Sequence, residues 1–314
     1  MIGIICFNSL RYAQYLYKYS LYFDQNNISY EVLFWNREGE KNELPYNWLN
    51  YNEEINSFVP FYKKIFKFIK YVLFLRKKIK ERKYNKIIVL TTQTAVPLFT
   101  LLLSKYSKKY IYDYRDITYE RFLLYRFIVN KIIDNSYFTA ISSSGFKQVL
   151  KNKSKLIIAH NTRDFEPIKD NPKEKKSPRI RVVYWGMVRQ LSFNFTICDL
   201  FGRDERFELI YHGAGYHKEL FEYCISNGYS NISITGAYNL KEIDSFINHT
   251  DIILNAYEND HVQKMATTVK FYDSLRFKIP MIVTSNSHMA KIVTEFNLGF
   301  SINWSDVKCL NNLY

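Results

Sequence analysis

The chain has 314 residues, and its 44 Lys and Arg against 30 Asp and Glu give a formal net charge of +14. Hydrophobic residues make up 47% of the chain, which excludes a disordered protein, and the length suits about two domains that each bury a core. Residues 1–163 hold 27 basic and 12 acidic side chains, whereas residues 164–314 hold 17 and 18. The excess positive charge therefore lies in the first half, which predicts two domains with different partners.

The sequence shows no targeting segment. No run approaches the ~18 consecutive apolar residues of a membrane span, and the N-terminus MIGIICFNS lacks the basic region and cleavage site of a signal peptide. The four cysteines are scattered and form no Cys-x-x-Cys pair, so neither a disulfide framework nor a zinc site is expected. These features favour a protein of the reducing cytoplasm.

Short, continuously apolar runs alternate with segments of helical pattern along the whole chain. The predicted strands are Ile2–Phe7, Tyr30–Trp35, Ile87–Thr92, Tyr110–Asp113, Tyr137–Ile141 and Leu156–Ala159, then Ile180–Trp185, Phe207–Tyr211, Ile232–Thr235, Ile252–Asn255, Met281–Thr284 and Gly299–Ile302. Such runs are typical of strands buried on both faces of a parallel sheet, and their alternation with helices predicts βαβ units. We therefore expect two Rossmann-like α/β domains, residues 1–163 and 179–314, joined by the proline-containing connector 164–178.

A basic helix is predicted within Phe61–Lys86, where eleven basic side chains accompany one acidic side chain. Its apolar residues recur at spacings of three and four, the period of an amphipathic helix. One interpretation is a helix packed on its sheet with a solvated basic face. Another is a helix that also lies against an anionic membrane surface. Nucleic acid is disfavoured as a partner because no DNA- or RNA-binding motif accompanies the charge.

Several sequence signatures of catalysis are absent. The first βα turn, from Asn8 to Arg11, has no glycine fingerprint, which argues against dinucleotide binding there. The chain has no Walker loop, no His-Glu-x-x-His, no Gly-x-Ser-x-Gly and no Asp-x-Asp. The last absence argues against a transferase that holds a nucleotide diphosphate through a metal ion.

Glycines follow two strands of the predicted second domain. Gly186 comes directly after Ile180–Trp185, with Arg189 three residues later, and Gly213 and Gly215 follow the next strand. Glycines at such places let a ligand approach the backbone, and the following helix N-terminus favours a phosphate. A tight turn between strand and helix explains the same glycines without a ligand.

The segment Lys270–Thr284, KFYDSLRFKIPMIVT, resembles a segment of the GT-B glycosyltransferases, especially retaining, sugar-nucleotide-dependent enzymes of bacterial capsule and surface-polysaccharide synthesis. Lys270 matches the lysine and Asp273 the acidic residue of their Lys-x-x-Glu motif. The resemblance implies two Rossmann-like domains facing a cleft, with the second binding a nucleotide diphosphate-sugar. It places Asp273 on the ribose hydroxyls and the basic groups Arg189 and Lys270 on the diphosphate.

The resemblance extends to other segments and also departs from the family. Gly186, Gly213 and Gly215 resemble the glycine turns of the donor domain. In the first half, Tyr112–Asp116 resembles a segment that faces the cleft, which gives Arg115 and Asp116 a role in orienting a sugar; a helix-capping role for Asp116 stays open. Asp273 replaces the usual glutamate. The family's earlier glutamate falls at Met265, so Glu258 or Asp260 would have to substitute.

The predicted function is a metal-independent glycosyltransferase that moves a sugar from a nucleotide diphosphate-sugar to a lipid-linked saccharide acceptor. We expect no cofactor, no metal and no nucleic-acid partner, and a peripheral position on the inner face of the cell membrane through Phe61–Lys86. The predicted catalytic residues are Arg189, Lys270, Asp116, Arg115 and Glu258. The alternatives are a glycerol- or ribitol-phosphate transferase, a nucleotide-sugar epimerase, and a degenerate, non-catalytic partner of the same fold.

Overall fold

The structure is a computed structural model that describes residues 1–10, 13–39, 43–55, 60–162, 177–306 and 308–313. The chain divides into two compact units, Met1–Asn161 and Thr162–Tyr314, and each is described by itself. The predicted connector 164–178 lies outside the described residues as far as residue 176.

The first unit contains a parallel sheet of seven strands in the order β3-β2-β1-β4-β5-β6-β7. The six predicted strands are present, with bounds within two residues of those expected, and Trp48–Asn52 adds one strand that was not predicted. The strands are β1 (Ile2–Cys6), β2 (Tyr30–Asn36), β3 (Trp48–Asn52), β4 (Lys86–Leu90), β5 (Tyr110–Tyr114), β6 (Phe138–Ile141) and β7 (Leu156–Ile158).

Both faces of this sheet are covered by helices, which explains the continuously apolar strands. Helix α1 (Gln14–Gln25) buries Leu16 and Phe23 against alternate residues of β1 and β2. The opposite face receives α2 (Phe61–Arg82), whose Tyr71 stacks on Trp35 at a centroid distance of 5.0 Å and donates a 2.5 Å hydrogen bond to the Cys6 carbonyl.

The remaining helices of the first unit continue the layer that α2 begins. Helix η2 contacts both α2 and α5, and α4 also contacts α5. These elements are α3 (Thr92–Ala95), η2 (Val96–Leu98), α4 (Phe99–Leu103) and α5 (Leu123–Asn135), with the short helices η3 (Ser144–Gln148) and η4 (Lys153–Lys155) following β6. The predicted basic helix is confirmed, and it ends where Lys83 adopts a left-handed conformation.

The second unit contains a parallel sheet of six strands in the order β10-β9-β8-β11-β12-β13, and all six were predicted. They are β8 (Ile180–Trp185), β9 (Phe207–His212), β10 (Ile232–Gly236), β11 (Ile252–Leu254), β12 (Met281–Thr284) and β13 (Gly299–Ile302). The helices are α6 (Leu191–Gly202), α7 (His217–Ser226), η5 (Leu240–Glu242), α8 (Ile243–Asn248), η6 (Gln263–Met265), α9 (Val269–Phe277), α10 (His288–Glu295) and η7 (Cys309–Leu313).

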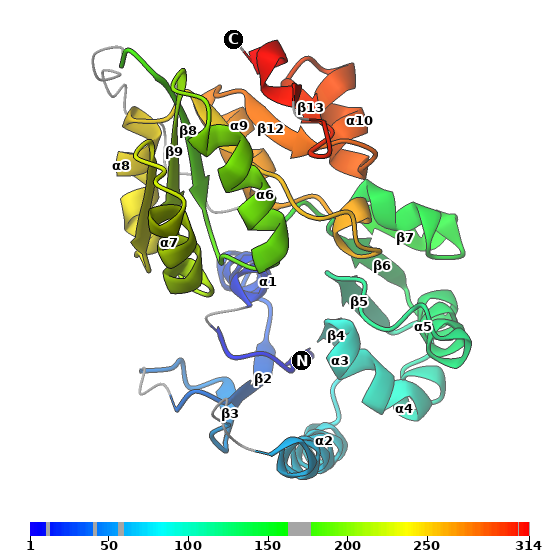
Figure 1. Ribbon diagram of the computed structural model, residues 1–314. Coiled ribbons are helices and arrows are strands. Elements are labelled where there is room, and N and C mark those ends of the chain that lie inside the picture. Colours follow the sequence, from blue (N-terminus) through cyan, green and yellow to red (C-terminus); the bar gives the residue numbers. More distant parts are fainter. Residues whose placement is uncertain (11–12, 40–42, 56–59, 163–176, 307, 314) are drawn as a thin grey trace. The chain divides into compact units, whose positions relative to one another are not determined.

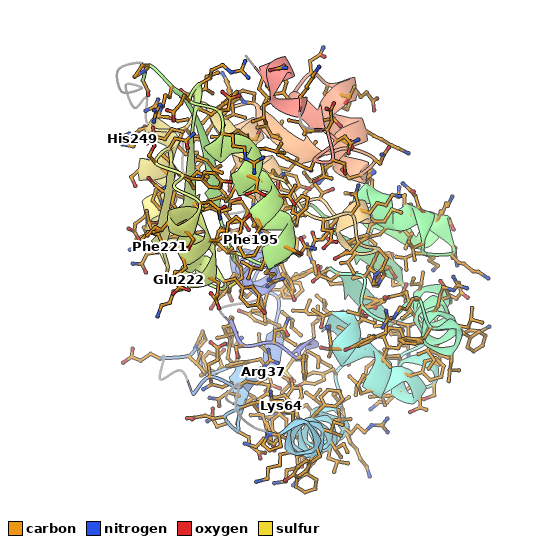
Figure 2. All side chains as sticks on the ribbon, viewed as in Figure 1. Arg37, Lys64, Phe195, Phe221, Glu222 and His249 are labelled. Carbon is orange, nitrogen blue, oxygen red and sulfur yellow. The ribbon has the colours of Figure 1, made fainter. Side chains whose placement is uncertain are left out.

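Two groups of helices cover this second sheet. Helices α6 and α7 bury residues such as Phe201 and Leu220 against one face and lie side by side (Figure 1). Phe195 of α6, which is labelled in Figure 2, stacks on Tyr223 of α7 at a centroid distance of 3.9 Å. Helices α8, α9 and α10 bury residues such as Phe271 against the opposite face. None of the helices in the described ranges is long and apolar enough to cross a membrane.

The strand orders identify where a ligand site belongs. In each sheet the chain first proceeds toward one edge and then crosses back to the other side of its first strand. The resulting switch points lie between β1 and β4 in the first unit and between β8 and β11 in the second. Ligands of open α/β sheets bind at the carboxyl ends of the strands at such points.

Candidate functional site

Three successive strands of the second unit end in closely packed glycine turns. The Gly186 amide donates to the His212 carbonyl at 2.9 Å, and the Gly213 amide donates to the Gly236 carbonyl at 2.6 Å. A Cβ atom on Gly213 would lie 1.7 Å from the Gly186 carbonyl oxygen, and one on Gly215 would lie 2.4 Å from the Val188 carbonyl oxygen. Gly213 and Gly215 therefore serve the close approach of two backbone loops, as the tight-turn interpretation expects.

Gly186 has a different environment, because it lies beside the ammonium group of Lys270. Its φ of +140° belongs to the region that favours glycine. A Cβ atom on Gly186 would lie 3.4 Å from Lys270 Nζ. The two residues are 84 positions apart in the sequence, and the carboxyl end of β8 brings Gly186 to the first turn of α9. The structure thus brings together two of the predicted site residues.

The Lys270 side chain is 5% exposed and is enclosed by aromatic rings. Its Nζ donates to the Trp185 carbonyl at 3.2 Å and to the Tyr257 hydroxyl at 2.5 Å. The same atom lies 4.1 Å from the ring centroid of Tyr184 and 4.9 Å from that of Tyr257, distances typical of cation–π contacts. Burial raises the pKa of Tyr257 to about 12, so its hydroxyl stays protonated. The Lys270 amine is therefore held in place at the switch point of the second sheet.

Asp273 lies one helical turn after Lys270 and contacts the same strand. Its carboxylate is 1% exposed and accepts a 3.0 Å hydrogen bond from the Trp185 indole nitrogen. Helix α9 thus holds Trp185 at two points, since Lys270 binds its carbonyl and Asp273 its ring. The predicted contact of Asp273 with a ribose stays a prediction. The structure shows that the Asp273 carboxylate also binds the buried Trp185 indole.

Arg189 and Glu258 lie in two loops that are tied to each other. Arg189 is exposed in the loop before α6, and its charge acts to lower the pKa of Tyr257 against the larger raising effect of burial. The next residue, Gln190, accepts a 3.1 Å hydrogen bond from the Glu258 amide and donates to Asp260 at 3.3 Å. The structure therefore brings the Glu258 loop to the loop of Arg189, and both side chains are exposed to solvent.

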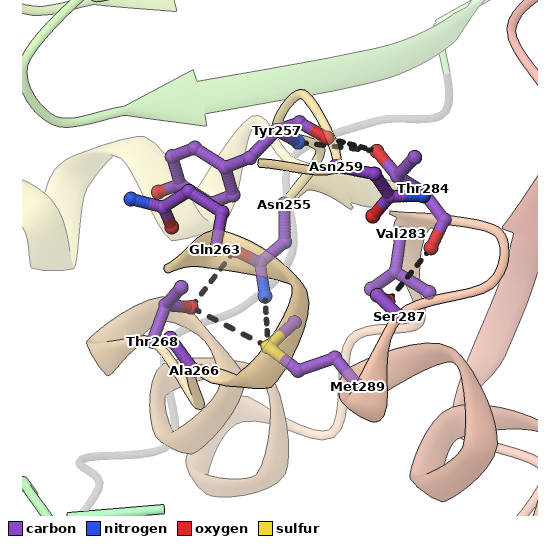
Figure 3. A pocket seen from close by; sticks show the side chains of 10 residues that line it. All are labelled: Asn255, Tyr257, Asn259, Gln263, Ala266, Thr268, Val283, Thr284, Ser287 and Met289. Atoms are coloured by element: carbon purple, nitrogen blue, oxygen red, sulfur yellow. Dashed lines mark hydrogen bonds between the residues drawn. The ribbon is translucent and has the colours of Figure 1, made fainter. Parts of the chain in front are cut away.

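A small polar pocket lies beside this cluster, at the carboxyl ends of β11 and β12 (Figure 3). The Thr268 hydroxyl donates to Asn255 at 2.8 Å, and the Thr284 hydroxyl donates to the Tyr257 carbonyl at 2.6 Å. The ten lining residues carry no charge. Seven have an amide or hydroxyl side chain, namely Asn255, Tyr257, Asn259, Gln263, Thr268, Thr284 and Ser287, and three are apolar, namely Ala266, Val283 and Met289. The sequence interpretation missed this set as a group, although polar residues directly after two buried strands are a usable signal.

Arg115 and Asp116 belong to the first unit, where the two differ in exposure. Arg115 is 7% exposed, pairs with Asp113 at 2.5 Å and donates to the Ala159 carbonyl at 3.0 Å. Burial opposes its charge, but the charge and hydrogen bond of Asp113, together with Tyr19 and Tyr15, raise the pKa of Arg115. Asp116 is exposed. Arg115 is therefore held by a buried ion pair, whereas Asp116 is accessible to a ligand.

Thr91 is a residue of the first unit that the sequence interpretation did not select. It follows β4 at the switch point and has φ 71° and ψ 157°, a region that is almost confined to glycine. Its amide donates to the Asp113 carbonyl at 2.9 Å. Nearby, the Thr94 hydroxyl accepts from the Phe7 amide at 2.9 Å. Backbone strain of this kind is common at functional sites. The residue type alone does not predict that Thr91 adopts this conformation.

The described residues contain no group of three or more His, Cys, Asp or Glu that could hold a metal ion. The absence of a metal from the reaction stays a prediction from the sequence.

Comparison with solved structures identifies the fold. The structure aligns with sucrose-phosphate synthase from Thermosynechococcus elongatus at a TM-score of 0.71 and 11% identity, covering 99% of this chain and 88% of that one. Anabaena Alr3699/HepE in complex with UDP aligns at 0.66 and 11%, covering 99% and 88%. UDP-GlcNAc 2-epimerase from Methanocaldococcus jannaschii aligns at 0.62 and 11%, covering 99% and 90%. No family model and no curated protein sequence matches the chain. The predicted fold of two Rossmann-like domains, GT-B, is confirmed.

Proposed function

We propose that the chain is a glycosyltransferase that binds a nucleotide diphosphate-sugar through its second unit. The observation that carries the proposal is the ammonium of Lys270, buried among aromatic rings at the switch point and next to the Gly186 backbone. A fixed cation beside a side-chain-free backbone suits a diphosphate, and Arg189 adds a second, exposed cation. Support for this class of ligand comes from the similar fold of Anabaena HepE, which was solved with UDP.

The proposed chemistry breaks the bond between the sugar's anomeric carbon and the diphosphate oxygen and forms a bond to an acceptor hydroxyl oxygen, whose proton is released. Negative charge grows on the leaving diphosphate as the first bond breaks. Lys270 and Arg189 would stabilise that charge. Removing one such preorganised donor should therefore slow the chemical step. The uncharged pocket around Asn255 and Thr284 would take hydroxyl groups of the donor. Glu258 and Asp273 are proposed to contact its sugar and ribose, and retention of configuration is proposed from the family resemblance.

The acceptor is proposed to be a saccharide on a lipid carrier, in surface-polysaccharide synthesis. The support is the first unit's basic helix α2, whose Tyr62, Phe66 and Leu73 are 68%, 59% and 61% exposed among lysines. Large apolar side chains interspersed with lysines suit the interface of an anionic membrane. With an acceptor embedded in that membrane, the second unit would bind the soluble sugar donor and the first unit would bind the lipid substrate. Asp116 is proposed to help orient a sugar, with Arg115 held behind it by Asp113.

The test combines binding and turnover. Calorimetry with UDP, GDP, dTDP and CMP should show binding to one of them, and a donor panel with mass spectrometry should then identify the sugar. Lys270→Met, which keeps the aliphatic stem, and Arg189→Ala should each lower kcat by about 100-fold, the effect of losing one transition-state donor. Lys291→Ala, an exposed lysine on α10, is the matched control, with thermal unfolding as the check on folding.

Two outcomes would contradict the proposal. Turnover close to that of the unchanged protein in both Lys270→Met and Arg189→Ala would remove these residues from the site. No binding to any of the four nucleotides would favour a non-catalytic partner. An epimerase is the second candidate, because an epimerase from M. jannaschii shares the fold. It would convert the sugar nucleotide with no acceptor present, which the same mass spectrometry detects.

A further inference from the structure

The first unit has a second exposed apolar surface that the proposed donor site and α2 do not use. It lies in the loop after β5 and the first turns of α5. We call it the α5 patch, and its members with their exposed fractions are Tyr119 (57%), Phe122 (53%), Leu123 (73%), Leu124 (73%) and Phe127 (56%). Single exposed apolar side chains are ordinary on a protein surface, but a contiguous group of this size indicates an interaction surface.

The exposure of the α5 patch follows from how its loop is anchored. Glu120 is 2% exposed and accepts hydrogen bonds from the Tyr114 hydroxyl at 2.9 Å and the Thr118 amide at 2.5 Å. The Phe122 amide donates to the Tyr119 carbonyl at 2.9 Å. Helix α5 meanwhile buries its other face through Val129, Ile132 and Ile133. The loop and the helix are thus both held to the unit while the patch faces outward.

The charges around the α5 patch identify the kind of partner. Within residues 116–134, all of them described, the acidic residues are the exposed Asp116, the buried Glu120 and, at the end of α5, Asp134, which accepts a hydrogen bond from Asn152. The basic residues are Arg121, Arg126 and Lys131; the Arg121 guanidinium lies 4.8 Å from the Phe122 ring and Lys131 Nζ lies 5.6 Å from the Phe127 ring. Aromatic and aliphatic side chains mixed with cations suit the headgroup region of an anionic bilayer. A second copy of this basic half of the chain, net +15, would be repelled.

The α5 patch and the exposed side of α2 belong to one layer of the first unit. Helix η2 contacts both α2 and α5, and all of them cover the same face of the sheet (Figure 1). Helices α2 and α5 each lead into a following parallel strand, so both begin at the carboxyl edge of that sheet. The exposed apolar residues of α5 and all of those of α2 except Leu73 lie in the first half of their helix, and therefore toward the same edge.

We propose that the α5 patch is a second membrane-contact surface, which enters the interfacial region of an anionic bilayer together with α2. One contact element leaves a protein free to rotate on the membrane, whereas two at one sheet edge fix its orientation. The carboxyl edge of the first sheet, which carries Thr91 and Asp116, then faces the lipid. This inference rests on the proposed membrane association and is independent of the proposed sugar chemistry.

The first test measures insertion directly. The chain has four tryptophans, and all are at most 7% exposed, so a new surface tryptophan can be distinguished from them. Leu124→Trp in the full chain should be quenched by vesicles of brominated phosphatidylglycerol and shift its emission to the blue. Leu240→Trp, at a 62% exposed position of the second unit, is the matched control and should show neither effect. An unquenched Leu124→Trp protein that still floats with the vesicles overturns the proposal.

The second test separates the α5 patch from α2. The variant Leu123→Ser/Leu124→Ser/Phe127→Ser should partition at least about tenfold less onto phosphatidylglycerol vesicles, since it loses three interfacial side chains. The control Ile225→Ser/Leu240→Ser/Phe296→Ser removes three side chains of 62–63% exposure from the second unit and should bind unchanged. If Phe66→Ser/Leu73→Ser abolishes flotation while the α5 variant floats normally, α2 docks alone and the inference fails. A dimer that forms without vesicles and is lost in the α5 variant would assign the patch to a second copy and also overturn it.

Discussion

At the scale of single residues, the site shows which side-chain contacts can be predicted from the sequence and which cannot. Lys270 and Gly186 come together because β8 ends and α9 begins at the carboxyl edge of one sheet, and the family resemblance had assigned both residues to one site. The hydrogen bond of Asp273 to the Trp185 indole depends on side-chain rotamers within a packed core. That hydrogen bond does not follow from residue type and spacing. The ion pair of Arg115 with Asp113, in contrast, joins residues two positions apart at the end of β5, where such residues share one face of an extended chain.

Thr91 gives a prediction about backbone strain. Backbone strain at φ 71° and ψ 157° lowers the free energy of unfolding by about 1–3 kcal/mol for a β-branched residue, and glycine has no such strain. Glycine in turn makes the unfolded chain more flexible, at a cost of about 0.5–1 kcal/mol. Thr91→Gly should therefore leave the free energy of unfolding unchanged or raise it by about 1 kcal/mol, measured by urea denaturation. Thr91→Ala retains the Cβ atom and the strain, so it serves as the control and should be less stable than Thr91→Gly. The reverse order would contradict a strained Thr91.

At the scale of helices and strands, most of the fold was predictable because burial on both faces produces continuous apolar runs. All twelve predicted strands are present. The exception, β3, is an edge strand with the sequence WLNYN, in which Trp48 alone is buried. Asparagine has a low propensity for strands, and an edge strand needs no continuous apolar run. The strand conformation of residues 48–52 therefore depends on pairing with β2.

Helix α2 was predicted to be amphipathic, but the sequence does not tell which of its apolar residues face the sheet. Leu75 is 1% exposed, and Leu73, two residues earlier, is 61% exposed. Leu75→Ala should lower the free energy of unfolding by about 2–4 kcal/mol through loss of buried contacts. Leu73→Ala should change it by less than about 0.5 kcal/mol while weakening vesicle binding. Urea denaturation and flotation measured on both variants test the assignment, and equal stability losses would contradict it.

At the scale of the whole molecule, the uneven charge predicts how membrane binding depends on salt. The first half carries +15 and the second −1, and eleven of the basic side chains lie within residues 61–86. Each cation near an anionic surface contributes about 1 kcal/mol at moderate ionic strength, and salt screens that contribution as the Debye length falls from about 10 Å at 0.1 M to about 3 Å at 1 M. Partitioning onto phosphatidylglycerol vesicles should therefore fall at least about tenfold between 0.05 M and 0.5 M NaCl.

Apolar insertion is not screened in this way, and this separates the two contributions. Binding that persists in 0.5 M NaCl should come from the exposed side chains of α2 and the α5 patch, so the α5 triple serine variant should remove most of it. A charge variant such as Lys63→Gln/Lys70→Gln should instead lose binding at low salt and match the unchanged protein at high salt. Phosphatidylcholine vesicles, which carry no net charge, control for electrostatic attraction. Salt-independent binding of the unchanged protein would mean that the positive charge of the first half has a different partner.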